Sequence, residues 1–268
     1  RPYPHFTSIR RDGWSIGKSS YNSLQVRLEK RYGFGLNFTT AYTLSKYIDG
    51  AGFNNDYPLS QEPIRQLSEV DSTHRWSFAG IYDLPFGKGR PFGANGPAAL
   101  NHLVGGWQIN WLITYQSGLP LTVPSGLESL GNANLKDRTL DRWFNTCYVD
   151  TAGRQRSCMP GEQPVWFVRP PFTIRTTPAR FPDLRANSRP NYDLSVFKNF
   201  EVTERLRLEY RCEFLNAMNM AFFGNRGGGS AINTTFDSPN FGAAGAVGGP
   251  RTQYNFPRMI QMALRLRF

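Results

Sequence analysis

Hydrophobic and polar residues alternate along seven long stretches of the chain, and the alternation is most regular in the last stretch, 257–268. In a β-strand, successive side chains point to opposite faces, so this pattern predicts a strand with one apolar and one polar face. The apolar parity consists of Ile260, Met262, Leu264, Leu266 and Phe268. The opposite parity carries Gln261, Arg265 and Arg267, so the two predicted faces differ strongly in polarity.

The same alternation predicts six further strands. We expect them at about 20–32, 36–47, 75–84, 107–116, 190–200 and 206–214. Their lengths of about 9 to 13 residues exceed the 5 or 6 residues that are usual in globular proteins. A tilted strand needs about 9 to 11 residues to cross a lipid bilayer. Length and alternation together therefore favour the wall of a transmembrane β-barrel, with lipid on one face and a polar lumen on the other.

The connections between these strands differ in length in an ordered way. With the last strand ending in the periplasm, the short turns and one intermediate connection fall at the periplasmic end: Gly33–Gly35, Glu201–Glu204 and Gly87–Leu103. The three longest connections fall at the outer end: Ile48–Thr73, Gly118–Arg189 and Ala217–Phe256. Short periplasmic turns and long outer loops are the rule in such barrels. We expect the long loops to be unstructured, which would be unusual in a compact soluble domain.

These patterns predict an all-β fold, an antiparallel meander of about seven long transmembrane strands. Bacterial single-chain barrels have an even number of strands, so seven strands do not close one. We therefore expect residues 1–268 to be the C-terminal portion of a larger barrel.

Composition narrows the alternatives. No stretch approaches the roughly 18 consecutive apolar residues of a membrane helix. The formal net charge of +11 would suit a nucleic-acid partner. However, the basic residues are scattered over turns and alternating strand positions, which fits lipid headgroups or a pore lining equally well. We expect outer-membrane lipid as a partner and no nucleic acid.

The three cysteines have different surroundings in the sequence. Cys147 and Cys158 lie close together in a loop rich in Pro, Gly and Arg, a spacing suited to a disulfide in an oxidising compartment. The alternative for this pair is two free thiols. Cys212 lies on the apolar parity of a predicted strand, so we expect it to stay unpaired and to face lipid.

No catalytic or metal-binding pattern stands out. The histidines His5, His74 and His102 are far apart and lack the spacing of metal ligands. Two carboxylates, Glu209 and Glu213, could serve acid–base chemistry, but the interleaved Arg207 and Arg211 favour ion pairs in a wet lumen. We therefore expect no enzyme activity, no metal site and no cofactor.

The polar parity of the predicted strands supplies the candidates for contact with a ligand or with a plug inside the lumen. They are Arg27, Glu29, Arg75, Gln108, Asn110, Arg207, Glu209, Arg211 and Glu213. The alternative for each of them is simple hydration of a polar wall.

Several segments resemble TonB-dependent outer-membrane receptors, and in particular the Oar-like subgroup, which carries a carboxypeptidase-regulatory-like N-terminal domain. The matching segments are 20–31, 41–46, 71–76, 84–89, 106–110, 116–120, 193–200, 213–219 and the terminal strand. That strand, with its final Phe268, also resembles the C-terminal sorting signal of bacterial outer-membrane proteins. This second resemblance implies recognition by the barrel-assembly machinery in the outer membrane.

The first resemblance implies a plugged barrel of about 22 strands that is powered from the inner membrane through TonB. The plug, the TonB box and the regulatory domain are not in these 268 residues, and we expect them elsewhere in the parent chain. The implied function is energised uptake of a scarce ligand. Two alternatives stay open, a passive porin or structural outer-membrane protein, and a soluble β-rich binding module.

Overall fold

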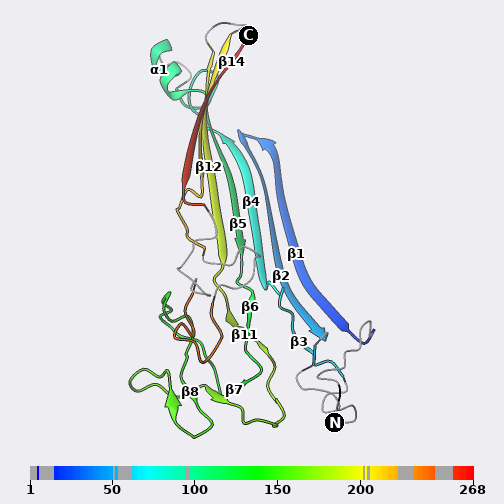
Figure 1. The fold of residues 1–268 in the computed structure, drawn as a ribbon. Helices are drawn as coiled ribbons and strands as arrows, with labels where there is room; N and C mark the ends of the chain where they lie inside the picture. The colour runs from blue at the N-terminus through cyan, green and yellow to red at the C-terminus, as the bar shows by residue number, and fades with distance from the viewer. Residues whose placement is uncertain are drawn as a thin grey trace.

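The computed structural model describes residues 5, 15–50, 52–53, 62–93, 97–201, 203, 206–222, 232–244 and 256–268. Within them, seven long antiparallel strands form one sheet in which neighbours follow chain order (Figure 1). They are β1 (Lys18–Gly33), β2 (Leu36–Gly50), β4 (His74–Asp83), β5 (Trp107–Gln116), β12 (Arg189–Glu201), β13 (Arg207–Leu215) and β14 (Met259–Arg267). The two-residue strand β3 (Gln66–Leu67) pairs with the end of β2. The predicted seven-strand meander is confirmed.

The register of the strand pairs brings the apolar parity of every strand onto one face, which we call the apolar face. One row of directly paired residues crosses six strands: Leu36, Tyr82, Ile109, Val196, Cys212 and Met262. Large side chains on this face lie open to the surroundings, and Leu24 and Leu264 are 60% and 68% exposed. An apolar surface that extends over a whole sheet is not stable in water and is typical of a surface that contacts another apolar phase.

Aromatic residues fill the centre of the apolar face. The ring centroid of Trp111 lies 5.3 Å from that of Phe78, which in turn lies 5.8 Å from that of Phe38. The Trp111 ring lies across Gly80 on the neighbouring strand, where a Cβ atom would be only 2.3 Å from the ring. A glycine at this position therefore lets the indole lie flat on the strand.

The two ends of the sheet differ as predicted. At the short-turn end the β1–β2 turn uses Phe34 and Gly35, both with positive φ, as a tight two-residue hairpin requires. The connection between β4 and β5, for which the sequence analysis predicts only an intermediate length, contains the helix α1 (Ala98–Val104). This helix begins after Pro97 and ends at Gly105, residues that favour a helix start and a helix stop. Its seven residues are too few for a period of 3.6 to be visible in the sequence.

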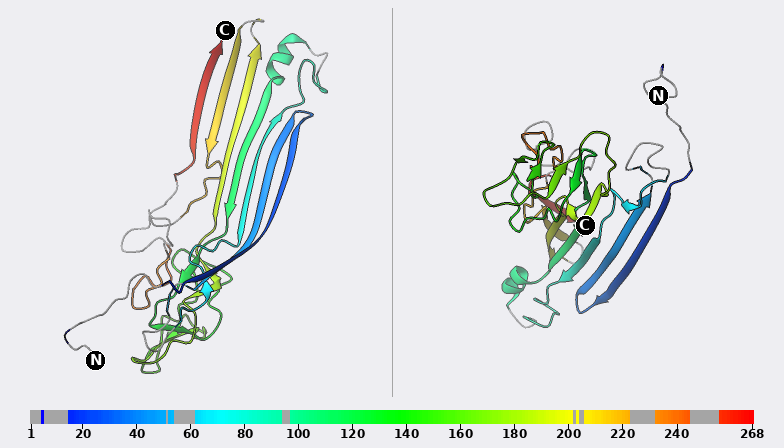
Figure 2. Two further views of the ribbon diagram at one scale, coloured as in Figure 1. Left: turned by 90° about the vertical axis from the view of Figure 1, so that its right-hand side faces the viewer. Right: turned by 90° about the horizontal axis from the view of Figure 1, so that it is seen from below.

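The prediction that the long outer loops are unstructured is wrong for Gly118–Arg189. This connection contains six short strands: β6 (Pro120–Thr122), β7 (Leu127–Ser129), β8 (Tyr148–Val149), β9 (Gln155–Arg156), β10 (Trp166–Val168) and β11 (Arg180–Arg185). They form one four-stranded and one two-stranded sheet. Together with residues 232–244 they build a folded body at the outer end of the wall (Figure 2), which we call the outer-loop unit.

The outer-loop unit holds the main apolar core found among the described residues. Its buried members are Leu121, Val123, Leu127, Ala133, Phe144, Tyr148, Trp166, Leu184, Ile232, Phe241 and Ala244. The aromatic rings meet edge to face, with the centroid of Phe144 5.4 Å from that of Phe241. The unit therefore folds as a small soluble domain does, whereas the wall leaves its apolar side chains exposed.

Two arginines of β11 fasten the outer-loop unit to the wall. Arg185 forms an ion pair with Asp71 (2.6 Å), whose carboxylate is 1% exposed and also accepts the backbone N–H of Tyr47. Arg180 forms an ion pair with Asp49 (3.3 Å) at the end of β2. Burial of the Asp71 carboxylate makes its arginine partner necessary, because an unpaired buried charge would be strongly destabilising.

A second buried carboxylate, Glu128, holds the outer-loop unit together internally. It accepts hydrogen bonds from the backbone N–H groups and the hydroxyls of Thr176 and Thr177. Burial favours the neutral form of the carboxyl, but these hydrogen bonds outweigh that effect, so the pKa of Glu128 lies below its ordinary value. Glu128 is thus an ionised acceptor that orders Thr176 and Thr177.

The two faces of β14 should respond differently to mutation. Leu264→Arg places a charge on the apolar face, whereas Arg265→Ala changes the polar face and leaves the apolar one intact. We expect Leu264→Arg to cost about 2–4 kcal/mol if this position lies near the bilayer midplane, and Arg265→Ala to cost little. The yield of heat-modifiable barrel in purified outer membranes measures the difference. Equal yields for the two variants would contradict the assignment of faces.

Glu128 should make the outer-loop unit sensitive to acid. Because its folded pKa is lowered, its stabilising effect is present above the ordinary value of 4.5 and is lost as the pH falls through the folded pKa. Glu128→Gln should cost about 1–3 kcal/mol at neutral pH and abolish this pH dependence. Hydrogen exchange of the Thr176 and Thr177 amides between pH 3 and pH 6 is the measurement. Equal protection of these amides in variant and wild type at pH 6 would refute the role of Glu128.

Candidate functional site

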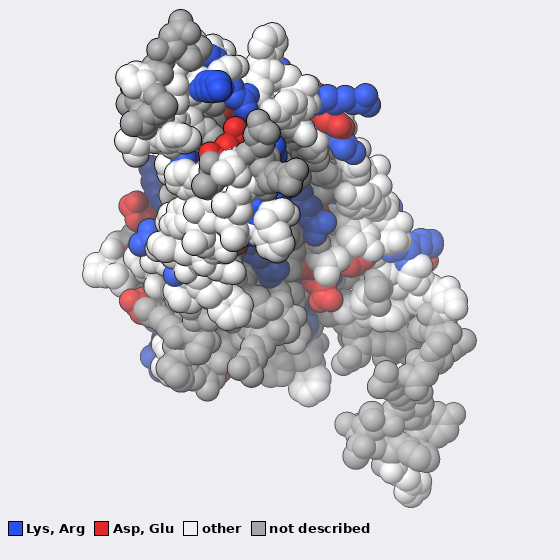
Figure 3. Space-filling view, turned by 90° about the horizontal axis from the view of Figure 1, so that it is seen from above, with Lys and Arg blue, Asp and Glu red and all other residues white. Residues whose placement is uncertain are grey.

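The face opposite the apolar face carries all nine residues that were predicted to line a lumen, and we call it the polar face. The register places them at different heights of the same surface, with Arg75 near the outer end and Arg207 at the opposite end. Lys and Arg side chains are interspersed with Asp and Glu in Figure 3, which views the molecule from the end that carries the C-terminus. Such mixed charge on one side of a strongly apolar sheet is what a water-filled interior requires.

A cluster of arginines surrounds Glu209 near the short-turn end. The Glu209 side chain is buried and forms ion pairs with Arg211 and with Arg267 (2.8 Å). Arg267 lies directly opposite Arg207 on the neighbouring strand, and two like charges in such a pair repel each other. The Glu209 carboxylate therefore holds together a patch that would otherwise repel itself.

Three more of the predicted residues have local partners or neighbours on the polar face. Gln108 donates a hydrogen bond to Asp83 (2.8 Å), which also pairs with Arg90. Asn110 has a buried side-chain nitrogen that makes no hydrogen bond among the described residues. Glu213 lies opposite Gln261 and has no ion pair in the described part of the chain.

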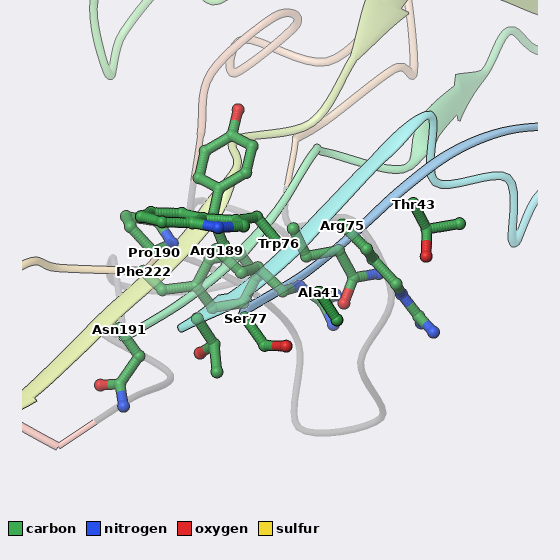
Figure 4. A pocket seen from close by; sticks show the side chains of 12 residues that line it. Ala41, Thr43, Arg75, Trp76, Ser77, Arg189, Pro190, Asn191 and Phe222 are labelled. Atoms are coloured by element: carbon green, nitrogen blue, oxygen red, sulfur yellow. The ribbon is translucent and has the colours of Figure 1, made fainter. Parts of the chain in front are cut away.

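The remaining predicted residues do not form one cluster: Arg27 and Glu29 lie in the half of β1 next to the β1–β2 turn, and Arg75 lies at the outer end of β4. Arg27 and Glu29 form an exposed ion pair (3.1 Å) with each other on β1. Arg75 lines a cavity that has a volume of about 550 Å³. The cavity is lined by residues of β2, β4, β5 and β12 (Figure 4), and those of β4, β5 and β12 lie at the outer ends of these strands. We call it the outer cavity.

The outer cavity is built from rows of paired residues. Arg75 on β4 pairs with Gln116 on β5, which pairs with Arg189 on β12, and the next row contains Ser77, Thr114 and Asn191. Phe222, from the connection after β13, contributes an aromatic wall, and the Arg189 guanidinium lies 4.7 Å from the centre of its ring. The described lining is completed by Ala41, Thr43, Trp76, Tyr115 and Pro190, and it includes no Asp or Glu.

Several residues of this cavity were not predicted from the sequence. Arg189 was assigned to the end of a long loop, yet β12 begins at this residue and gives it the same parity as Asn191. Extending the predicted strand 190–200 by one residue toward the N-terminus would have included it. Phe222 reaches the cavity only because the long connection after β13 passes beside it, so no local sequence pattern predicts its position.

The structure assigns a position to each cysteine and to the apolar residues of the terminal strand. The structure pairs Cys147 with Cys158 in a disulfide within the outer-loop unit, with their Cα atoms 4.2 Å apart. Cys212 is a free thiol on the apolar face, buried between its neighbours. The five apolar residues of the predicted assembly signal are 55–98% exposed: Ile260, Met262, Leu264, Leu266 and Phe268.

The described residues lack two features. None of their helices has the length and apolar character needed to cross a membrane. Nor do they bring together three or more His, Cys, Asp or Glu side chains that could hold a metal ion.

Residues 1–261 match the family model described as an outer membrane beta barrel domain. The chain belongs to this family. No curated protein and no solved structure matches it. The protein accordingly localises to the bacterial outer membrane, where the apolar face of the sheet contacts lipid. The prediction that the alternating strands belong to an outer-membrane β-barrel is confirmed. The polar face is the side turned away from lipid.

The arginine cluster should depend on Glu209 for its stability. Glu209→Gln removes the charge that balances Arg207, Arg211 and Arg267, and we expect it to destabilise the β13–β14 pair by about 1–3 kcal/mol. The matched control is Glu213→Gln on the same face of the same strand, which should have a much smaller effect. The measurement is the temperature at which the heat-modifiable band of each variant converts to the unfolded form. If the two variants convert at the same temperature, Glu209 has no special role.

Proposed function

We propose that this chain is the C-terminal part of the barrel of a TonB-dependent transporter that takes up a scarce ligand with energy supplied through TonB. In this proposal the plug domain of the same parent chain fills the lumen, and the barrel-assembly machinery recognises the terminal strand. The segments that resemble Oar-like receptors support it, because they extend over most of the strands.

The observation that carries the proposal is the position of the outer cavity. It lies on the polar face near the outer end, where a ligand from outside meets the lumen, and it is lined by charged, amide and hydroxyl side chains. Binding sites of this kind combine an enclosed volume with a few fixed polar groups. A wall that only conducts water and ions has no need of such a site.

The free edges of the sheet support a larger barrel. In the meander, β1 and β14 are separated by an even number of strand reversals, so both run in the same direction. Each leaves a backbone edge without a partner strand in the described residues. Direct pairing of these two edges would be parallel, whereas outer-membrane barrels are antiparallel. An odd number of additional strands restores antiparallel closure, as expected if further strands of the parent chain lie between them.

The second candidate is a passive porin. The interspersed ion pairs of the polar face, such as Arg27 with Glu29, favour it because they suit the wall of a water-filled channel. The two candidates differ in whether the lumen is blocked in the resting protein.

Electrical conductance of the full-length outer-membrane protein in a planar bilayer separates the two candidates. With potassium chloride as the only permeant salt, we expect almost no steady current, because the plug closes the lumen. Addition of urea, which unfolds a plug before it unfolds a barrel, should open a large channel. We also expect the protein to bind the purified periplasmic domain of TonB. A stable open channel without urea, together with no binding to TonB, would favour the porin and overturn the proposal.

A further inference from the structure

We propose that the helix α1 lies in the headgroup region of the periplasmic lipid leaflet and that Lys198 fastens it there. The helix stands beside the end of the sheet that carries the C-terminus (Figure 2). It is thus an interfacial anchor that extends the lipid contact of the wall beyond the ends of its strands. This inference concerns how the barrel is held in the membrane and is independent of the proposed uptake function.

The first argument is the position of Lys198 on the apolar face. On β12 it has the same parity as Val196, and it pairs directly with Trp107 on β5 and with Tyr210 on β13. A lysine on a lipid-facing surface is costly unless its ammonium group reaches polar partners. Lys198 is only 2% exposed although it lies among exposed apolar side chains, so another part of the protein covers it.

The C-terminal end of α1 provides this cover. The Lys198 ammonium group donates hydrogen bonds to the carbonyl oxygens of Leu103 (3.2 Å) and Gly105. The last carbonyl groups of a helix have no partner within it and carry a partial negative charge, so a cation is favoured at this point. These bonds place the end of the helix over the apolar face, on the side of the sheet that contacts lipid.

Aromatic side chains complete the attachment. Trp107, the first residue of β5, donates its indole N–H to the carbonyl oxygen of Leu103 (2.8 Å). The Lys198 nitrogen lies 5.0 Å from the centre of the Trp107 ring and 5.1 Å from that of Phe200, which are favourable cation–π contacts. Tryptophan is enriched where membrane lipid meets water, because its ring is apolar and its N–H finds a polar partner there. The attachment therefore fits the level of the headgroups.

The connection that contains α1 also exposes apolar side chains beside the helix end. Leu103 is 71% exposed, and Phe86 and Phe92 are exposed as well, with their ring centroids 5.9 Å apart. A Cβ atom on Gly87 would lie only 2.6 Å from the Cα atom of Gly105, so the segment next to Phe86 packs directly against the end of the helix. Apolar side chains on a short helix at the edge of a lipid-facing surface are typical of an interfacial segment.

Two observations favour lipid headgroups over a protein partner at this surface. The exposed side chains continue the apolar face, whose partner is membrane lipid. The connection 84–106 contains Lys88, Arg90 and His102 but no Asp or Glu, and Lys88 and His102 are exposed. Basic residues beside an apolar surface suit the negatively charged phosphates of the headgroup region.

The test is a spin label on α1 in the full-length outer-membrane protein, reconstituted into vesicles of phosphatidylethanolamine and phosphatidylglycerol. The label is attached at Leu103→Cys in a Cys212→Ala background, which removes the free thiol of the wall. Labels at Met159 in the outer-loop unit and at Leu264 in β14 serve as references for water and for lipid. We expect the Leu103 label to collide with a water-soluble nickel complex about three times less often than the Met159 label. Its collision rate with oxygen should lie below that of the Leu264 label, because the headgroup region is shallower than the hydrocarbon core.

Variants of Lys198 test its role as a positioning residue. Lys198→Met removes both hydrogen bonds to the helix end, so the Leu103 label should become more mobile and its nickel collision rate should rise. Lys198→Arg keeps a charged donor and should change both quantities less. The matched control is Lys30→Met, which removes a lysine from the apolar parity of β1, three strands away from β5. This control should leave the Leu103 label unchanged.

Trp107→Phe gives a milder variant in case Lys198→Met does not fold. It keeps an aromatic ring and loses only the N–H bond to Leu103, so it should raise the mobility of the label less than Lys198→Met does. Heat modifiability checks that each protein is folded before its label is measured.

Two results would overturn the inference. Equal nickel collision rates for the Leu103 and Met159 labels in folded protein would show that α1 projects into water. Equal label mobility in Lys30→Met and in a folded Lys198→Met or Trp107→Phe variant would show that the contacts of Lys198 and Trp107 do not hold the helix. Neither result bears on the conductance and TonB measurements, since a barrel can transport a ligand or conduct ions with or without this anchor.

Discussion

The strand register is the constraint on which the rest of the structure depends. Successive side chains alternate between the faces of a strand, so a slip of one residue in any strand pair would move every apolar side chain of one strand to the polar face. The one register shift among the wall strand pairs lies between Lys30 and Gly33, beside the β1–β2 turn. From there to the outer end, seven strands keep their parities aligned, and a lipid-facing surface and a polar interior exist only because they do.

The wall and the outer-loop unit are stabilised in different ways. The wall leaves side chains such as Leu24 and Leu264 exposed and depends on lipid for their burial and on inter-strand hydrogen bonds for its shape. The outer-loop unit buries its own core around Trp166 and Phe144 and carries the disulfide. Arg185 and its ion pair with Asp71 join the two, so the folded loops are held at a fixed place above the polar face.

The parts of the fold that follow from local alternation could be predicted from the sequence. The positions and order of the seven strands, their apolar faces and the placing of the long connections all come from period-2 patterns that need no tertiary information. The ends of the strands were predicted less well than their centres. The strands β1 and β2 extend over 16 and 15 residues, and their outer ends include polar residues such as Ser19 and Asp49, where the alternation is weak.

The outer-loop unit and the outer cavity could not be predicted in the same way. Strands of two or three residues, such as β8 and β9, are too short to show a period, and their core is assembled from segments about 100 residues apart. Alternation did identify Arg75 as a residue of the polar face. Its meeting with Arg189 and Phe222 depends on the order of strands in the sheet and on the path of a long connection, which local patterns do not contain.

The division into a lipid face and a water face is tested most directly by a spin-label scan along β14, from Met259 to Arg267, in protein reconstituted into lipid bilayers. Collision rates with oxygen, which concentrates in lipid, and with a water-soluble nickel complex should alternate with a period of two residues and in opposite phase. Oxygen maxima are predicted at Ile260, Met262, Leu264 and Leu266, and nickel maxima at the residues between them. Rates without this period, or oxygen maxima at Gln261 and Arg265, would contradict the account.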